Sequence, residues 1–299
     1  MTRIVVIGKT GQLARALGEC EVPGAEMVFL GRDRLDLTDA SAIEPTILAA
    51  APDLVINAAA YTAVDRAETE PELAHRVNGA AVGEIAAAAA AADAPLVHVS
   101  TDYVYDGSKM EPYTEEDPTA PINRYGATKL AGENTALAAN PRTVILRTAW
   151  VYAPWGRNFL LTMLRLARER AEIRVVDDQR GSPTSALELA IAIAAIAPRL
   201  IGEPDDGSIW GAYHYTGKGE TSWAGFAHTI FAGAESRGLI ETVPRIIPIT
   251  SAEYPTPAAR PANSVLDCTK FERSFAVKSR PWEEALARVL DRLRKETVN

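Results

Sequence analysis

The sequence predicts an α/β fold in which a parallel sheet is doubly wound, with helices on both faces. In the first half of the chain, short apolar segments alternate with segments of helical composition. Such alternating βα units form parallel sheets covered by helices. In addition, the first apolar segment runs directly into a glycine turn and a helix, the context that a dinucleotide site requires. A Rossmann-type sheet therefore follows, with a ligand expected across the carboxyl ends of the strands.

Individual elements follow from composition. The run from Arg3 to Ile7 is apolar and β-branched and predicts a buried strand. The alanine run at 86–92 favours a crossover helix, because alanine has the highest helix propensity. Strands are predicted at 4–7, 27–30, 54–57, 96–100 and 144–147, and helices at 11–17, 40–50, 71–92 and 124–139.

After about residue 150 the alternation loosens, because prolines interrupt it repeatedly between Pro183 and Pro261. We predict a dinucleotide-binding domain over residues 1–150. Residues 151–299 are expected to form mostly a smaller α/β substrate-binding lobe, from which some segments return to the first domain.

Composition is that of an ordinary globular protein, with a formal net charge of −8 and no basic patch, which argues against nucleic-acid binding. Cys20 and Cys268 lie far apart and indicate neither a disulfide framework nor a thiolate metal site. The longest apolar helix candidate, 186–197, is too short for a membrane span and contains Glu188. We expect a cytoplasmic protein without membrane contact.

The glycine turn reads G-x-x-G-x-x-A, with Gly8, Gly11 and Ala14 at the three small positions. Glycines let the backbone approach a pyrophosphate, and the helix that follows offers free N–H groups and a favourable dipole. Alanine is still small enough for close helix–strand packing. By itself such a turn is weak support for a nucleotide site, since ordinary βα turns look alike.

A Ser-Thr-Asp segment at 100–102 is followed by Tyr125 and Lys129, four residues apart. On a helix, positions i and i+4 lie on one face. A lysine ammonium beside a phenol lowers the phenol pKa from about 10 toward the range useful in acid–base catalysis. The spacing alone arises often by chance, but here it accompanies the glycine turn and an Asn-Ala-Ala-Ala segment at 57–60.

Together these motifs resemble the extended short-chain dehydrogenase/reductase superfamily, and within it the dTDP-4-dehydrorhamnose reductase family. The matching segments are 8–13, 57–65, 100–105, 125–133, 147–152, 254–258 and 260–264. The resemblance implies NAD(P)H-dependent reduction of the C4 carbonyl of dTDP-4-dehydro-β-L-rhamnose to dTDP-β-L-rhamnose, the last step of dTDP-L-rhamnose biosynthesis.

Residue roles follow from the resemblance. Tyr125 would protonate the alkoxide, Thr101 would hydrogen-bond the carbonyl oxygen, and Lys129 would lower the Tyr125 pKa and hold the nicotinamide ribose. Predicted substrate-binding residues are Thr101, Asp102, Trp150, Arg260 and Asn263. For Trp150 a simple core position, and for Arg260 a structural salt bridge, are equally open. Predicted cofactor-binding residues are Gly8, Thr10, Gly11, Gln12, Leu13, Arg32, Asp36, Leu37, Ala60, Tyr61, Thr62, Val99, Tyr125 and Lys129.

Cofactor preference depends on Arg32. It follows the second predicted strand, where an arginine accommodates a 2′-phosphate. We therefore expect NADPH to be preferred, with NADH possible, although Arg32 in a solvated loop is an even alternative.

Some members of the family are described as dimers with magnesium held by glutamates. The corresponding positions here are Ala16 and Leu187, with Glu188 one residue out of register. No metal is predicted, and monomer and homodimer both stay open. His75, His98, His214 and His228 occur singly and are expected to be structural or surface residues.

Two other functions are considered. A nucleotide-sugar epimerase or dehydratase shares the Tyr–Lys pair but keeps NAD bound, and the segment at 260–264 favours the reductase. A non-catalytic regulatory subunit resembling that of methionine adenosyltransferase has no chemical need for Thr101, Tyr125 and Lys129 together.

Overall fold

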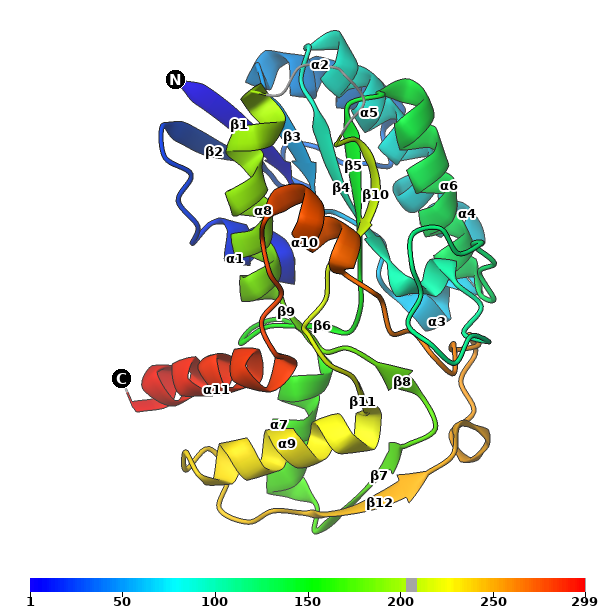
Figure 1. Cartoon of the computed structure of the whole chain (residues 1–299), viewed down its shortest axis with the longest axis vertical. Helices are drawn as coiled ribbons and strands as arrows, with labels where there is room; N and C mark the ends of the chain where they lie inside the picture. Colours follow the sequence, from blue (N-terminus) through cyan, green and yellow to red (C-terminus); the bar gives the residue numbers. More distant parts are fainter. Residues whose placement is uncertain (203–208, 299) are drawn as a thin grey trace.

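The computed structural model describes residues 1–202 and 209–298, and its centre is a six-stranded sheet (Figure 1). The strands lie in the order β10-β5-β4-β3-β1-β2, and each neighbouring pair is parallel. They are β1 (Thr2–Ile7), β2 (Ala25–Leu30), β3 (Leu54–Asn57), β4 (Leu96–Thr101), β5 (Thr143–Thr148) and β10 (Gly211–His214). The five predicted strands are confirmed, and the α/β class with them. Strand β10 was not predicted.

Alternate residues of each strand face opposite helical layers. Ile4 and Val6 of β1 pack in one core with α1 and α8, whereas Val5 and Ile7 pack in another with α2 and α5. All four are at most 1% exposed, as expected for a parallel sheet covered on both faces. The helices of these layers are α1 (Gln12–Leu17), α2 (Ala40–Ala50), α5 (Ala81–Ala91), α6 (Arg124–Ala139) and α8 (Ala186–Gly202).

The predicted helix at 71–92 is interrupted. It consists of α4 (Pro71–His75), a π-helical turn η1 (Arg76–Ala80) and α5. Helix α6 crosses this turn closely, because a Cβ on Gly132 would lie 2.1 Å from the Asn78 carbonyl oxygen. The turn also directs the Asn78 side chain to the backbone of Tyr61, where it accepts from the N–H at 2.8 Å and donates to the carbonyl at 3.0 Å. π-Helical turns occur frequently at functional sites.

The second lobe, drawn below the sheet in Figure 1, has its own apolar core. Its helices and paired strands are α7 (Phe159–Glu169), α9 (Trp223–Glu235), α11 (Trp282–Val298), β7 (Glu172–Val176) and β12 (Arg245–Ile249). Helix α8, strand β10 and helix α10 (Thr269–Phe275) follow elements of the second lobe in the sequence, yet they pack with the six-stranded sheet. The chain therefore passes between the lobes more than once.

The remaining elements are short. They are β6 (Val151–Tyr152), β9 (Thr184–Ser185), β8 (Arg180–Gly181), β11 (Thr221–Ser222), α3 (Val64–Ala67) and the 3₁₀ turns η2 (Asp102–Val104) and η3 (Ser251–Glu253). Among the helices described, none is both long and apolar enough to cross a membrane.

Candidate active site

The glycine turn lies at the carboxyl end of β1. Gly8 has a φ of 110°, a conformation that favours glycine, and its N–H donates to the Leu30 carbonyl at 2.8 Å. Gly11 begins α1 without a side-chain cap, and the space where its Cβ would stand is open. The first N–H groups of α1 have no partner within the helix. This open turn fits a dinucleotide pyrophosphate, because it offers backbone donors and no side chain in the way.

The predicted cofactor residues collect at the carboxyl edge of the sheet. Thr10 and Thr62 are exposed, and Ala60, Tyr61 and Val99 are half-buried at the ends of β3 and β4. Leu13 and Leu37 differ, since both side chains are only 7% exposed and belong to the two cores beside the sheet. Neither side chain is therefore placed to make a broad contact with a ligand.

Gln12 joins the glycine turn to the second lobe. Its side-chain oxygen accepts from Asn158 Nδ2 at 2.8 Å, and its backbone oxygen accepts from Trp155 Nε1 at 3.2 Å. The Trp155 ring in turn lies between two guanidinium groups, those of Arg15 at 4.4 Å and Arg292 at 4.6 Å from its centroid. A cofactor on this turn would therefore contact a segment already tied to the substrate lobe.

Arg32 and Asp36 pair with each other beyond β2, with Arg32 Nε 3.2 Å from Asp36 Oδ2. Thr38 donates to Asp36 from its backbone and hydroxyl, and these hydrogen bonds lower the pKa of the carboxyl. The Arg32 side chain is 82% exposed. Exposed pairs contribute about 0–1 kcal/mol, so Arg32 is free to exchange this partner for a phosphate.

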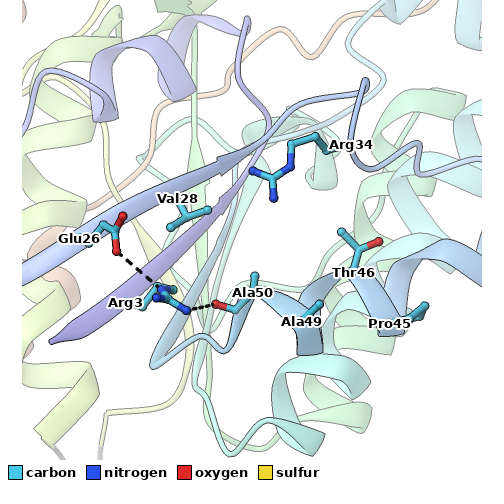
Figure 2. A pocket seen from close by; sticks show the side chains of 8 residues that line it. All are labelled: Arg3, Glu26, Val28, Arg34, Pro45, Thr46, Ala49 and Ala50. Atoms are coloured by element: carbon cyan, nitrogen blue, oxygen red, sulfur yellow. Dashed lines mark hydrogen bonds and ion pairs between the residues drawn. The ribbon is translucent and has the colours of Figure 1, made fainter.

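A hollow also lies along the outer strand β2, beside α2 (Figure 2). It is lined by Arg3 and Glu26 at the starts of β1 and β2, by Arg34, and by the end of α2. Arg3 donates to the Ala50 carbonyl at 3.0 Å and lies 3.7 Å from the Glu26 carboxylate. Ligands of doubly wound sheets bind at the carboxyl edge, which is the other end of these strands.

Tyr125 and Thr101 are brought together by the start of α6. Asn123 caps the helix by accepting from the Gly126 N–H at 2.7 Å. Gly126 permits a close approach, because a Cβ there would lie 2.1 Å from the Tyr103 carbonyl oxygen. Burial dominates and raises the pKa of Tyr125 to about 12, although the Thr101 side chain lies near enough to the Tyr125 hydroxyl to favour its ionised form.

Asp102 lies beside Thr101 and is 3% exposed. The Thr101 hydroxyl donates to Asp102 Oδ1 at 2.9 Å, whereas Oδ2 has no hydrogen-bond partner. The nearby Ser264 hydroxyl donates to the Arg180 carbonyl at 3.3 Å instead. Burial raises the pKa of Asp102 to about 6. An unpartnered buried oxygen in this position is ready to accept from a ligand hydroxyl.

Lys129 lies on α6, four residues after Tyr125, and is 1% exposed. Its Nζ lies 2.7 Å from the Val99 carbonyl and 3.2 Å from His98 Nε2. Burial lowers the pKa of Lys129 to about 8, and the charge of Glu133 partly opposes this. Burial dominates the pKa of Tyr125, and the lowering of that pKa by Lys129 stays a prediction.

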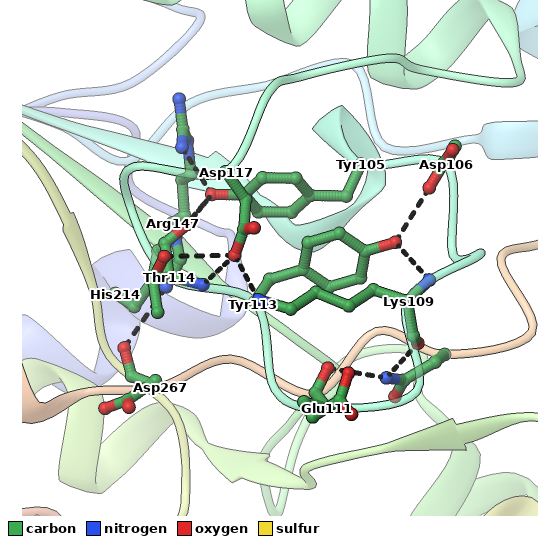
Figure 3. Close-up of polar contacts among 11 residues, drawn as sticks. Tyr105, Asp106, Lys109, Glu111, Tyr113, Thr114, Asp117, Arg147, His214 and Asp267 are labelled. Carbon is green, nitrogen blue, oxygen red and sulfur yellow. Dashed lines mark hydrogen bonds and ion pairs between the residues drawn. The ribbon is translucent and has the colours of Figure 1, made fainter.

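A buried network supports the strands behind these residues. Arg147 of β5 makes a two-pronged ion pair with Glu133 of α6, with Nη2 to Oε2 at 2.6 Å. The same arginine donates to the Tyr105 hydroxyl at 2.7 Å, which contacts His214 Nε2 at 2.8 Å (Figure 3). Ser100 donates to Glu133 at 2.5 Å, so the network fixes the end of β4 immediately before Thr101.

Trp150 stacks on Trp223, with ring centroids 3.5 Å apart and planes 7° from parallel. Trp150 has a positive φ of 47°, and Gly181 makes room for its ring, since a Cβ there would lie 2.3 Å from it. Trp223 Nε1 donates to Gln179 at 3.1 Å. Trp150 is half-buried, and the pair forms a rigid aromatic surface between the lobes, as a sugar-pocket wall would need.

Arg260 and Asn263 are engaged within the protein. Arg260 forms a two-pronged ion pair with Asp65, at 2.5 and 2.9 Å, and donates to the Ala258 carbonyl at 2.6 Å. Asn263 donates to the carbonyls of Lys109 and Glu111 at 2.8 and 3.2 Å. These contacts match the structural alternative for Arg260, and the substrate-binding roles of both residues stay predictions.

Glu188 has cationic partners, with Arg280 at 3.2 Å and Arg288 at 3.5 Å. Among the residues that the structure describes, no group of three or more histidine, cysteine or acidic side chains is arranged to hold a metal ion.

Several residues of the site escaped the sequence analysis. His98 and His214 are fully buried, so the surface alternative is wrong for both. Asn78, Glu133 and Trp223 are further examples, and each acts on a residue far away in the sequence. The one available signal was register: His98 stands two residues before the Ser-Thr-Asp segment, on the same strand.

The fold and the site define a class. A glycine turn at the first strand, a Thr–Tyr–Lys group beside it and an aromatic surface from a second lobe are the arrangement of an extended short-chain dehydrogenase/reductase. The chain matches the RmlD substrate binding domain family over residues 1–295, and it belongs to that family.

Relatives agree over nearly the full length. The dTDP-4-dehydrorhamnose reductase of Sinorhizobium fredii is 46% identical over 288 residues, 96% of each chain, and that of Escherichia coli K12 is 39% identical over 97% of each chain. The crystal structure of a dTDP-4-dehydrorhamnose reductase from Bacillus anthracis in complex with NADP is 35% identical, with a TM-score of 0.89 over 98% of this chain and 100% of that one. The predicted resemblance is confirmed.

A more distant structure shares the fold alone. A dTDP-glucose 4,6-dehydratase from Streptomyces venezuelae is 17% identical and has a TM-score of 0.77 over 99% of this chain and 97% of that one.

Proposed function

We propose that the protein reduces the C4 carbonyl of dTDP-4-dehydro-β-L-rhamnose to dTDP-β-L-rhamnose, with NADPH as the preferred cofactor. The observation that carries the proposal is the meeting of Thr101, Asp102 and Tyr125 at the carboxyl end of β4. Full-length similarity to reductases of this name supports the substrate, and an NADP complex of one such relative supports the cofactor.

NADPH, when bound along the glycine turn, supplies the hydride that reduces the carbonyl carbon. The chain's own residues handle the proton and the orientation. The Tyr125 hydroxyl donates its proton to the oxygen that becomes the C4 alkoxide, and the phenol is kept protonated by its raised pKa. Thr101 turns its hydroxyl from Asp102 to donate to the same oxygen, and it helps to orient Tyr125. The free oxygen of Asp102 accepts from a neighbouring sugar hydroxyl.

The stacked rings of Trp150 and Trp223 support one face of the sugar, and Arg32 takes the 2′-phosphate after leaving Asp36. We propose further that residues 151–299 supply most of the substrate lobe, that the protein acts as a monomer or homodimer, and that it works in the cytoplasm. None of these three points is needed for the chemistry.

The test follows NADPH oxidation with dTDP-4-dehydro-β-L-rhamnose as substrate. We expect turnover by the unmodified protein and a loss of at least about a hundredfold in Tyr125→Phe, the contribution typical of general acid catalysis. NADPH binding, followed by its fluorescence, should persist in the variant. Tyr103→Phe is the matched control, because its ring packs edge-on against Tyr125 at 5.9 Å.

Absence of turnover with both NADPH and NADH, in folded protein that binds cofactor, would refute the reductase. Tightly bound NAD after purification would then favour an epimerase or dehydratase.

A further inference from the structure

Three buried polar side chains form a line behind the catalytic helix. Asn57 at the end of β3 and His98 in β4 are paired in the parallel ladder, and Asn57 Nδ2 lies 3.1 Å from His98 Nδ1. The other ring nitrogen, Nε2, lies 3.2 Å from Lys129 Nζ on α6. All three residues are at most 1% exposed, so the polar atoms depend on one another for hydrogen bonds.

The orientation of Asn57 fixes the tautomer of His98. The backbone N–H of Ala59 donates to Asn57 Oδ1 at 3.2 Å, so the amide turns its NH₂ group to the imidazole. His98 Nδ1 must then accept. Burial holds the pKa of His98 well below its ordinary value, and the ring is neutral. A neutral imidazole has one donor and one acceptor, which places the proton on Nε2.

This tautomer directs a donor at Lys129. An ammonium group has three donors and no acceptor, whereas a neutral amine has a lone pair. Lys129 already donates to the Val99 carbonyl at 2.7 Å, and only the neutral amine can also accept from His98. Two charged groups lie near this nitrogen: Glu133, four residues further along α6, and, through it, Arg147 of β5. Because Arg147 neutralises Glu133 in an ion pair, the carboxylate is a weak counterion for Lys129.

We infer that Asn57 and His98 are positioning residues, which direct a hydrogen-bond donor at Lys129 Nζ when no cofactor is bound and so favour its neutral amine, held against the Val99 carbonyl. When Lys129 is protonated, its ammonium and the His98 Nε2–H are both donors and cannot hydrogen-bond to each other. The ammonium then leaves His98 and turns toward Tyr125 and the cofactor ribose, where the proposed function places it. The role of Asn57 and His98 in positioning Lys129 for catalysis thus rests on the proposed function. The tautomer of His98 and the protonation of Lys129 in the free protein do not depend on it.

The tautomer can be measured directly in the unmodified, cofactor-free protein. Histidine labelled with ¹⁵N gives long-range ¹H–¹⁵N spectra that distinguish the two neutral tautomers and the imidazolium. The His98→Gln variant assigns the His98 signals. We expect the Nε2–H tautomer above about pH 8, where the neutral amine of Lys129 predominates. The Nδ1–H tautomer, or an imidazolium, would overturn the inference.

The effect on Lys129 is measured by titrating its ¹³C-labelled side chain, assigned with Lys129→Met. In His98→Met, which removes the donor, we expect the pKa of Lys129 to rise by about one unit, a tenfold change in proton affinity, the size of one net hydrogen bond. His98→Gln keeps a donor and should titrate like the unmodified protein.

Equal Lys129 titrations in all three proteins would overturn the inference. Should His98→Met not fold, the tautomer in the unmodified protein decides the question. Neither measurement uses substrate or turnover, so a failed reductase assay would leave both results standing and mark the proposed function alone as wrong.

Discussion

Replacement of Asp102 by asparagine should stabilise the protein at neutral pH while impairing the site. The carboxyl is 3% exposed, and its Oδ2 lacks a hydrogen-bond partner. Burial raises its pKa from 3.8 to about 6. The folded protein therefore holds the Asp102 proton more tightly than the unfolded chain does. Asp102 favours folding fully below pH 3.8, and this contribution is lost as the pH rises through about 6.

The size of the effect follows from the shift. Each pKa unit corresponds to about 1.4 kcal/mol, so a rise of about two units makes Asp102 about 3 kcal/mol less favourable to folding above pH 6 than below pH 4. An amide does not titrate. Between pH 4 and pH 7, the free energy of unfolding of Asp102→Asn should therefore rise relative to that of the unmodified protein by up to about 3 kcal/mol.

The assay is urea unfolding followed by circular dichroism at a series of pH values. Asp106→Asn is the matched control, since Asp106 accepts from the Ser108 N–H and the Tyr113 hydroxyl, and these contacts lower its pKa. This control should lose stability across the whole range. The quantity to follow is the free energy of unfolding of Asp102→Asn minus that of the unmodified protein. A value that stays constant with pH, or that falls as the pH rises, would refute the reasoning.

Two further predictions concern the framework. Arg147→Met leaves a buried carboxylate unpaired and should lower the free energy of unfolding by about 3–5 kcal/mol, whereas Arg165→Met breaks an exposed pair and should cost less than about 1 kcal/mol. Equal urea midpoints would contradict this. Gly8→Ala forces a side chain into φ 110° and should cost about 1–3 kcal/mol in the same assay, and Gly11→Ala, with an ordinary φ of −66° and open space, almost nothing. The reverse order would show that the turn is not strained.

Much of the fold was predictable because its signals are local. Strand β3 and helices α2 and α6 have the predicted bounds, since apolar runs, caps and turns act over a few residues. The glycine turn was equally visible, because φ at Gly8 depends on the immediate chain. The break at Arg76–Ala80 was not, because it arises where α6 packs against the turn.

The candidate site was predictable in its members and less so in their geometry. Spacing placed Tyr125 and Lys129 on one helical face, but the direction of the lysine depends on His98 and Val99, which another strand supplies. For the same reason, sequence could not show that Asp65 engages Arg260.

The sequence by itself determined the α/β fold, the glycine turn and the set of groups that carry the chemistry, because each depends on composition and short spacing. Only the tertiary structure decided how those groups are charged and directed. It buries Asp102 with one carboxylate oxygen unpartnered and turns Lys129 toward His98. The pKa of a buried group depends on what surrounds it in space, and those surroundings come from segments distant in the chain.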